Sequence, residues 1–261
     1  MKSECFVYRL GIVDYQKAWS LQKRLAGEVA AGEHPPALLL LEHPHTFTFG
    51  RRGKAENLLW EEEQLAKKGI QVHWVNRGGD VTYHGPGQLV GYPIIPLFPG
   101  NKMPKPDTRG GDGRKFPKAD VVGYIRKLEA VLISALAELG VAGGQVDGLS
   151  GVWVQPHAPS RCLYCPPGMR QKPAKIAAIG LKVDASGISS HGFALNVEPD
   201  MSYWEGIIGC GLPDHPLICL ADMLEPAPGM EEVMDAVSQS FGQQFNYKMT
   251  SRAASEITSS A

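Results

Sequence analysis

The chain has 261 residues, of which 43% are hydrophobic and 20% are charged, and its formal net charge is −1. This is the composition of an ordinary globular protein, and no run approaches the roughly 18 consecutive apolar residues of a membrane span. The near-zero charge provides no general attraction to nucleic acid or to a membrane surface. We therefore expect neither a membrane nor a nucleic-acid partner, and any charged partner must be bound by a local patch.

The first residues and the cysteines predict a cytoplasmic protein. The segment MKSECFVYRLG runs directly into a strand-like pattern, without the apolar core of a signal peptide or the Arg/Ser-rich bias of a transit peptide. The five cysteines are an odd number scattered over the chain, which is unlike a disulfide framework. We therefore expect a reducing, cytoplasmic compartment, in which a thiol can remain free.

The first part of the chain predicts one long helix, a short helix and several strands. Asp14 caps a helix with apolar residues at helical spacing, and Gly32 ends it. The segment ALLLLEHPHTFTFG predicts two strands with a turn at Pro44, and EEEQLAKKG predicts a short surface helix. IQVHWV and LVGYPII predict two further strands, and Pro93 in the second favours an edge position or a bend.

The rest of the chain contains two irregular segments between regular elements. Residues 99–118 are rich in glycine, proline and basic residues and predict a mobile loop, and residues 155–173 are similarly irregular. Asp120 caps the clearest helix, which Gly140 ends. SGVWV begins a strand, KIAAIGLKV and HGFALNV predict a strand pair, and EEVMDAVSQSFGQQF predicts a final amphipathic helix.

The order of these elements predicts the fold class. Strands and helices alternate without strict βαβ order, which favours a single α/β domain of the α+β type, with a mixed sheet flanked by helices. We expect this domain to span residues 1–248, with inserts at about 99–118 and 155–173. The polar segment 249–261 predicts a disordered tail.

The stretch RGGDVTYHGPGQLVGYPI, which begins at Arg77, is the first candidate for a binding site. Gly78 and Gly79 give the backbone unusual conformational freedom and remove side chains that would keep a ligand away. Arg77 and His84 could face a polar group of a ligand across this bare surface. The alternative is a pair of tight turns between strands, with Arg77 in a salt bridge and His84 hydrogen-bonded.

Cys210 and Lys175 are the candidates for chemistry. Cys210 lies between two glycines in GIIGCGL, and a reactive thiol needs such open backbone and a nearby positive group. In a regular strand Lys175 shares an apolar face with Ala177, Ile179 and Leu181, whereas Lys182 lies on the opposite face. Such a lysine can supply a positive field or act as a neutral base. The alternatives are an inert cysteine and a strand-end lysine that reaches water.

A metal site is not expected. Cys162, Cys165 and His157 are the local candidates, but a zinc site usually requires four ligands and only three are present here. The remaining cysteines and the His-Pro-His turn are expected to be structural: Cys5, Cys219, His43 and His45.

The motifs RGGDVTYHGPGQLVGYPI, GVWV, KIAAIGLKV, HGFALNV and CGL occur in this order, and together they resemble the octanoyl-acyl-carrier-protein:protein N-octanoyltransferase family. These enzymes are the lipoyl/octanoyl transferases of lipoate biosynthesis. The similarity runs from about RLGIVDYQKAW to the final helix. It implies the fold of the biotin and lipoate protein ligase catalytic domains.

The resemblance also implies roles for individual residues. Cys210 matches the cysteine nucleophile that carries the acyl-thioester intermediate, and Lys175 matches the lysine that lowers the pKa of that thiol. No cofactor is implied. The residues that match the substrate-binding segments are Arg77, Gly78, Gly79, Asp80, Val81, Thr82, Tyr83, His84, Ala178, Ile179, Gly180, Gly192, Phe193 and Ala194.

The implied reaction moves an octanoyl group from octanoyl-acyl carrier protein, through a cysteine thioester, to a lysine of a lipoyl domain. The implied acceptors are the lipoyl domains of 2-oxoacid dehydrogenase E2 subunits and the glycine cleavage H protein. Because acyl carrier proteins are acidic, the basic segment Lys102–Lys118, together with Arg51, Arg52 and Lys54, is a candidate docking surface. The alternative is that this segment is only a solvated mobile loop.

Two features depart from the family. Gly209 stands where the family usually has a proline before its cysteine, and the two irregular inserts are longer than the resemblance leads us to expect. Two alternative functions remain compatible with the sequence. One is an ATP-dependent lipoate or biotin protein ligase of the same fold, which would not require Cys210, and the other is a non-catalytic acyl-binding homologue.

Overall fold

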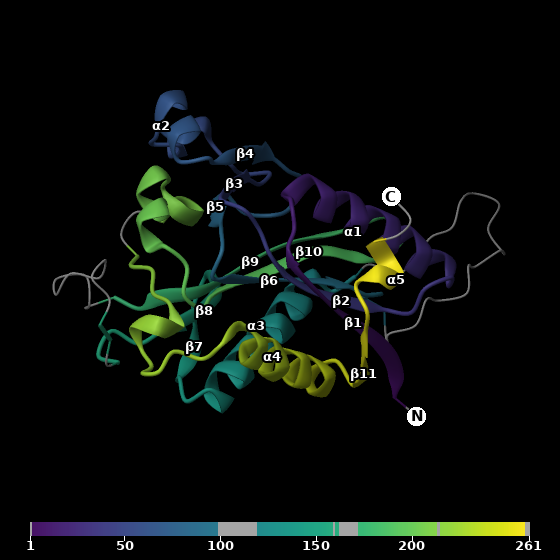
Figure 1. Cartoon of the computed structure of the whole chain (residues 1–261). Coiled ribbons are helices and arrows are strands. Elements are labelled where there is room, and N and C mark those ends of the chain that lie inside the picture. Colours follow the sequence, from purple (N-terminus) through teal and green to yellow (C-terminus); the bar gives the residue numbers. More distant parts are fainter. Residues whose placement is uncertain (1, 99–118, 159, 162–171, 213–214, 259–261) are drawn as a thin grey trace.

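The computed structural model describes residues 2–98, 119–158, 160–161, 172–212 and 215–258. Its centre is an eight-stranded mixed sheet (Figure 1). Across the sheet the strands are β11 (Tyr247–Arg252), β1 (Ser3–Ile12), β2 (Ala37–Glu42), β6 (Gln88–Ile94), β10 (Ser189–Asn196), β9 (Ala174–Val183), β8 (Leu149–Val154) and β7 (Gly143–Val146). Strand β1 is parallel to both of its neighbours, whereas the other pairs are antiparallel. The expected α+β architecture is confirmed.

Helices cover both faces of this sheet. Helix α1 (Tyr15–Ala31) packs on one face, and helices α3 (Val121–Glu138) and α4 (Met230–Gln244) pack side by side on the other (Figure 1). Each face has its own apolar core, because successive residues of a strand point to opposite sides of a sheet. The short helix α5 (Ser255–Thr258) extends the core on the α1 side.

The helix boundaries follow the capping residues that the sequence predicts. The Asp14 side chain accepts a hydrogen bond from the Lys17 amide at 3.1 Å, and Gly32 ends α1 with a left-handed conformation, φ 77°. Asp120 caps α3 in the same way by accepting from the Gly123 amide at 2.8 Å.

A second, three-stranded sheet stands beside the α1 face (Figure 1). It consists of β4 (Gln71–Trp74), β3 (Thr46–Phe49) and β5 (Val81–His84). Between β3 and β4 the chain forms a short 3-10 helix, η1 (Ala55–Asn57), and then helix α2 (Glu62–Lys67). The apolar cluster of this small sheet also includes residues of the 3-10 helix η4 (Met201–Gly206). Two further 3-10 helices follow along the chain, η5 (Gly209–Gly211) and η6 (Leu220–Asp222). The small sheet therefore holds β5 against the loop that carries Cys210.

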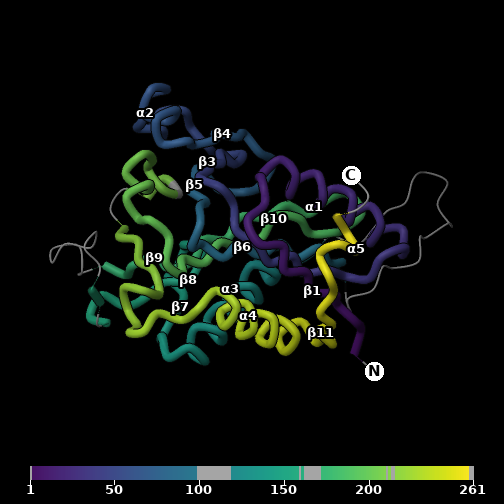
Figure 2. The backbone as a smooth tube through the Cα atoms, viewed as in Figure 1, coloured from purple at the N-terminus to yellow at the C-terminus, as the bar shows by residue number. Residues whose placement is uncertain are grey.

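Two expectations about the fold are wrong. The edge position, one of the two alternatives for Pro93, is wrong because β6 is central; the proline is tolerated because the ladder to β10 ends at Gly91. The expected disordered tail instead contains the last four residues of β11 and then α5. Strand β11 pairs in parallel with β1, so the two terminal strands lie side by side (Figure 2). Local composition does not predict that the segment after residue 248 pairs with a strand at the other end of the chain.

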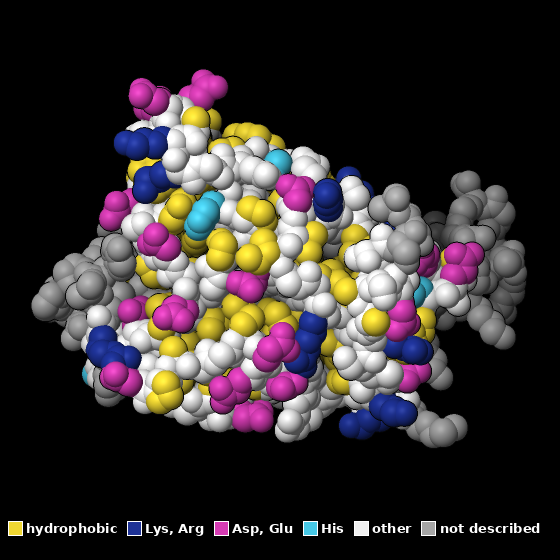
Figure 3. Space-filling view, in the orientation of Figure 1, with side chains coloured by type: hydrophobic (Ala, Val, Ile, Leu, Met, Phe, Trp, Pro, Cys, Tyr) yellow, Lys and Arg dark blue, Asp and Glu magenta, His cyan; other side chains and the backbone are white. Residues whose placement is uncertain are grey.

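The first strand is also fastened to α4 through charged groups. Arg9 forms ion pairs with Glu231 and Asp235, and acidic side chains gather over α4 in the space-filling view (Figure 3).

In the part of the chain that the structure describes, no helix is long and apolar enough to cross a bilayer.

Candidate active site

A cavity of about 410 Å³ lies between the large sheet, strand β5 of the small sheet and η5. One of its walls is formed by small residues of β9 and β10, which are registered as the pairs Ala178–Ala194 and Gly180–Gly192. Because none of these residues carries a side chain larger than a methyl group, the wall is flat. Such a slot accommodates a straight, unbranched apolar chain.

Lys175 reaches this cavity because of a β-bulge. Val152 of β8 is paired with Ala177, but the next residue, Trp153, is paired with Lys175, so one residue of β9 is skipped. A bulge of this kind reverses the alternation of side chains. Ala177 therefore packs into the core against α3 and α4, whereas Lys175 lines the cavity. The expectation that Lys175 and Ala177 share a face is wrong for this reason.

The Lys175 side chain is almost completely buried, with 5% of its surface exposed. Its Nζ lies 4.6 Å from the centroid of the Trp153 ring. Among the described residues, no carboxylate forms a salt bridge with it. A buried ammonium without a carboxylate is costly unless an anion is brought to it.

Hydrogen bonds hold the chain before and after Cys210, whereas the Cys210 side chain lies outside the described part of the structure. After the cysteine, the chain returns to β9: the Lys175 amide donates to Pro216 O at 2.8 Å and the Ile218 amide donates to Lys175 O at 3.1 Å. Before it, the Ile208 amide donates to Asn57 O at 2.9 Å. Gly211, which follows the cysteine, lines the same cavity as Lys175.

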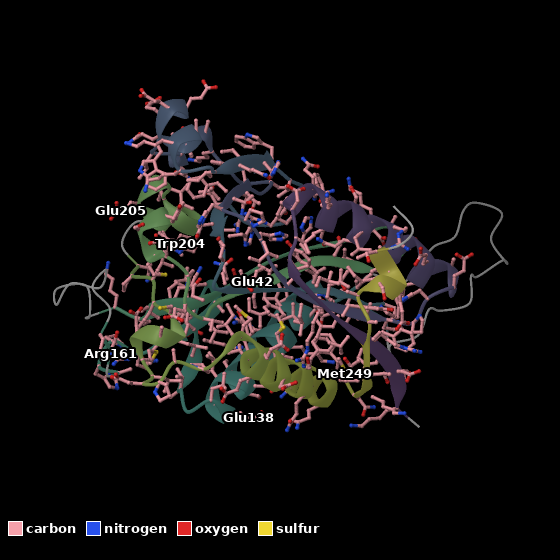
Figure 4. The ribbon with its side chains drawn as sticks, viewed as in Figure 1. Glu42, Glu138, Arg161, Trp204, Glu205 and Met249 are labelled. Atoms are coloured by element: carbon pink, nitrogen blue, oxygen red, sulfur yellow. The ribbon has the colours of Figure 1, made fainter. Side chains whose placement is uncertain are left out.

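Both glycines beside Cys210 are required by their surroundings. Gly211 has a left-handed φ of 65°, and a Cβ atom there would lie 2.8 Å from Asp80 Oδ2. A Cβ atom on Gly209 would lie 2.9 Å from Cζ3 of Trp204, a residue of η4 (Figure 4). The Trp204 ring thus occupies the space that a side chain at position 209 would need.

Arg77 lines the cavity but also braces its wall. Its guanidinium donates two hydrogen bonds to Thr48 of β3, one to the backbone carbonyl and one, at 2.9 Å, to Oγ1. It also donates to Gly78 O at 3.0 Å. The Asp80 carboxylate accepts from the Asn57 amide group at 2.9 Å and from its own neighbour, the Val81 N–H, at 2.7 Å. These bonds hold the glycine-rich stretch over the slot.

His84 is buried and held as one tautomer. Gln88 donates through Nε2 to Tyr83 O at 3.1 Å, so its Oε1 accepts from His84 Nδ1 at 2.8 Å. Burial, together with neighbouring His43 and Arg77, moves the pKa of His84 well below its ordinary value despite the Gln88 bond. The neutral ring therefore carries no hydrogen on Nε2, which accepts from Thr48 Oγ1 at 3.4 Å and cannot donate a hydrogen bond to the carbonyl of a bound ligand.

The structure brings together most of the residues that the sequence identified. All the expected binding residues line the cavity except Gly78 and Tyr83. The Tyr83 hydroxyl instead lies 3.0 Å from His45 Nδ1, away from the slot. Other lining residues were missed: Tyr15, Tyr92, Gly148, Leu149, Ser150, His191 and Leu212. The only available sequence signals were indirect, such as the position of His191 immediately before GFALNV.

No group of three or more potential metal ligands occurs among the described residues. Cys162 and Cys165 lie outside them, and His157 is exposed on the turn after β8. The Lys102–Lys118 segment likewise lies outside the described residues, whereas Arg52 and Lys54 lie on the rim of the cavity.

Comparison with known proteins identifies the family of this chain. The family model of the lipoyl protein ligase A/B catalytic domain matches residues 14–242. An octanoyltransferase of Chloroflexus aggregans is 42% identical over 229 residues, covering 88% of this chain and 89% of that protein. An octanoyltransferase of Solibacter usitatus is 39% identical over 245 residues, covering 94% of both.

The fold also matches that of solved lipoate ligases. A bipartite lipoate protein ligase from Thermoplasma acidophilum superposes with a TM-score of 0.69 at 16% identity, covering 99% of this chain and 90% of that one. Lipoate-protein ligase A bound with ATP has a TM-score of 0.68 at 14% identity, covering 100% and 92% of the two chains. The chain therefore belongs to the lipoyl protein ligase A/B catalytic domain family, and it is an enzyme of the acyltransferase class.

Proposed function

We propose that this enzyme transfers an octanoyl group from octanoyl-acyl carrier protein to a lysine of lipoyl domains, through a thioester on Cys210. The acceptors are the lipoyl domains of 2-oxoacid dehydrogenase E2 subunits and the glycine cleavage H protein. The observation that carries the proposal is that buried Lys175 and the residue after Cys210 line one slot-shaped cavity. The similarity to octanoyltransferases supports it. The reaction needs a free thiol, in keeping with a cytoplasmic setting.

In the first step, the Cys210 thiolate attacks the thioester carbonyl of the donor. A new C–S bond forms, the donor C–S bond breaks, and the ammonium of Lys175 gives its proton to the departing pantetheine thiolate. One thioester replaces another, so the step is nearly isoenergetic and needs no ATP. Burial of the Lys175 charge favours this proton transfer, because its anionic partner is consumed when the thioester forms.

In the second step, the neutral amine of the acceptor lysine attacks the enzyme thioester. The C–N bond forms, the C–S bond to Cys210 breaks, and the amine of Lys175 accepts the proton that the nucleophile loses. The products are the octanoyl amide and the original pair of thiolate and ammonium. An amide is more stable than a thioester, which drives the reaction forward.

The donor protein docks beside the rim of the slot. Arg52 and Lys54 line the cavity at this rim, and Arg51 precedes them on an exposed turn. Basic groups at this position attract an acidic carrier and direct its flexible pantetheine arm into the slot.

Intact-mass measurement tests the proposal. The enzyme is mixed with octanoyl-acyl carrier protein without ATP, and we expect one octanoyl adduct on Cys210 that hydroxylamine removes. Cys210→Ala is expected to form no adduct and to abolish transfer. Normal transfer by Cys210→Ala, or transfer that requires ATP, would instead identify a ligase. Binding of the donor without any adduct would identify a non-catalytic acyl-binding protein.

A further inference from the structure

Glu129, on α3, is a buried carboxylate that lies outside the cavity. Its exposed surface is 0%, and it sits on the helix face that otherwise buries apolar residues such as Leu128 and Leu132. Among the described residues it is the only buried carboxylate, and Lys175 is the only buried lysine. A buried charge costs free energy unless its surroundings compensate it, so packing alone does not account for a glutamate at this position.

Three donors hold this carboxylate in one orientation. Oε2 accepts from the Arg126 guanidinium and from the Gln145 side-chain amide, both at 2.8 Å. Oε1 accepts from the backbone N–H of Gly151 at 3.0 Å. Gly151 belongs to β8, the strand that pairs with the Lys175 end of β9. Charge-assisted hydrogen bonds of this kind are short and strong, so Glu129 firmly joins α3 to β8.

Strand β8 is irregular at the residue that Glu129 holds. Between Leu149 and Trp153, three residues of β8 face the single residue Gln145 of β7. The bulge against β9 lies in the same stretch, immediately before Trp153. Where the ladders on both sides are interrupted, neighbouring strands fix the backbone less than regular pairing does. The bond from Gly151 to Glu129 therefore provides a fixed point in the middle of this stretch.

Gly151 lies directly against the end of the Lys175 side chain. A Cβ atom on Gly151 would lie 3.4 Å from Lys175 Cε and 2.5 Å from Ala177 O, and its φ of 109° also requires glycine. Cε is the carbon that carries the ammonium group. The preceding residue, Ser150, lines the cavity together with Lys175. A shift of Gly151 would therefore move the surface on which the reactive end of Lys175 rests.

We propose that Glu129 is a positioning residue, which holds the Gly151 N–H and thereby keeps the ammonium of Lys175 in place in the slot. This inference rests on the function proposed above. In that mechanism Lys175 gives a proton in the first step and accepts one in the second, and both transfers require its nitrogen within hydrogen-bond reach of the reacting atoms. Glu129 does not line the cavity, so it acts on these steps and not on binding of the donor.

Two conservative variants separate the hydrogen bond from the charge. Glu129→Gln keeps an oxygen for the Gly151 N–H but has no charge, and the Gln145 amide can turn its own oxygen toward the new amide group. Glu129→Asp keeps the charge but is one methylene shorter, which withdraws its oxygens from Gly151 by about 1.5 Å. We expect Glu129→Gln to transfer octanoyl at the wild-type rate. For Glu129→Asp we expect kcat to fall about tenfold with an unchanged KM for octanoyl-acyl carrier protein.

The second readout is the pH midpoint for alkylation of Cys210 by iodoacetamide, measured by mass on the peptide that contains it. A displaced ammonium supports the thiolate less, so the midpoint should rise by about one pH unit in Glu129→Asp and stay unchanged in Glu129→Gln. Leu132→Ala is the control, because it removes packing from the same helix without touching this hydrogen bond and should not move the midpoint.

A wild-type midpoint and kcat in Glu129→Asp would overturn the inference. Equal defects in the Asp and Gln variants, or an equal shift in Leu132→Ala, would also overturn it, since the Gly151 bond would then not be the cause. Failure of the wild-type enzyme to form an octanoyl adduct would reject the proposed function, whereas the alkylation midpoints need no octanoyl donor and test Glu129 separately.

Discussion

The ammonium of Lys175 lies over the indole ring of Trp153, 4.6 Å from its centroid. The two residues are paired across β8 and β9, and the bulge next to this pair lets Lys175 line the cavity. The negative face of an indole ring stabilises a cation without neutralising it, as a carboxylate would. In the proposed mechanism, this arrangement keeps the positive charge of Lys175 available to the Cys210 thiolate.

Replacement of Trp153 tests this relationship. We expect Trp153→Leu to slow octanoyl transfer about tenfold, because a desolvated cation–π contact is worth up to about 2 kcal/mol. The pH midpoint for alkylation of Cys210 by iodoacetamide should move upward, since a less stable ammonium provides less support for the thiolate. Trp153→Phe keeps an aromatic face and should shift the midpoint less. Equal midpoints in all three proteins would show that the ring plays no electrostatic role.

Gly211 offers a test of how closely the cysteine loop must approach Asp80. A Cβ atom at Gly211 would lie 2.8 Å from Asp80 Oδ2, and the φ of 65° disfavours alanine. Gly69 has the same φ of 65° but no atom within 4 Å of the equivalent position. Both Gly→Ala substitutions should cost about 1 kcal/mol of folding free energy.

Only Gly211→Ala is expected to reduce transfer, by at least tenfold, because it alone displaces the cysteine loop. Denaturant unfolding and single-turnover acylation measure the two effects separately. If Gly69→Ala impaired acylation as strongly as Gly211→Ala, general backbone strain and not the contact with Asp80 would be responsible.

Several features of the fold follow directly from local sequence signals. Asp14 and Gly32 delimit α1, and Asp120 begins α3, because caps act through hydrogen bonds within one turn. The glycine-rich stretch and the KIAAIGLKV and HGFALNV strands could be assigned to one site by their motifs.

The orientation of Lys175 could not be predicted, because strict alternation places it in the core beside Ala177. The bulge that reverses it arises from the register between β8 and β9, a relationship between two strands rather than a property of either. The same limit applies to His191, whose left-handed conformation breaks the alternation of β10. Residues that depend on pairing or on special backbone geometry are therefore the ones that sequence patterns miss.

The flat wall of the slot predicts a strong size effect at Ala194. This residue is paired with Ala178, and both line the cavity. Ala194→Leu should place a branched side chain across the path of the acyl chain and reduce octanoyl transfer at least a hundredfold, with a smaller loss for butanoyl. Ala194→Ser adds little volume and is the control. Equal losses for octanoyl and butanoyl donors would indicate general damage instead of a blocked slot.

The basic rim of the cavity predicts a salt-dependent first step. Arg52 and Lys54 line this rim, so neutralising both with glutamine should raise the KM for octanoyl-acyl carrier protein several-fold at low ionic strength. The KM of a small octanoyl thioester without a carrier should not change. A wild-type KM for the carrier-bound donor that is independent of salt would reject this docking surface.

Buried His43 predicts that the fold loses stability in mild acid. Its Nδ1 donates to Val13 O at 2.6 Å, and its Nε2 accepts from the Tyr92 hydroxyl at 2.7 Å, so the neutral ring satisfies both partners. Burial lowers its pKa to about 4 from an ordinary 6.5. As the pH falls below 6.5, the unfolded chain binds a proton that the folded protein does not, so stability declines until the pH approaches 4.

At pH 5 this single histidine should cost about 2 kcal/mol relative to pH 7, because each pH unit within the window corresponds to about 1.4 kcal/mol. His43→Gln can keep both hydrogen bonds, since an amide donates to Val13 and accepts from Tyr92, but it does not titrate. Urea unfolding at both pH values should therefore show a loss about 2 kcal/mol smaller in the variant than in wild type. Comparing each protein with itself removes the fixed cost of the substitution. Equal losses in the two proteins would mean that His43 is already charged in the fold, and the hydrogen bond from Tyr92 to its Nε2 could not then exist.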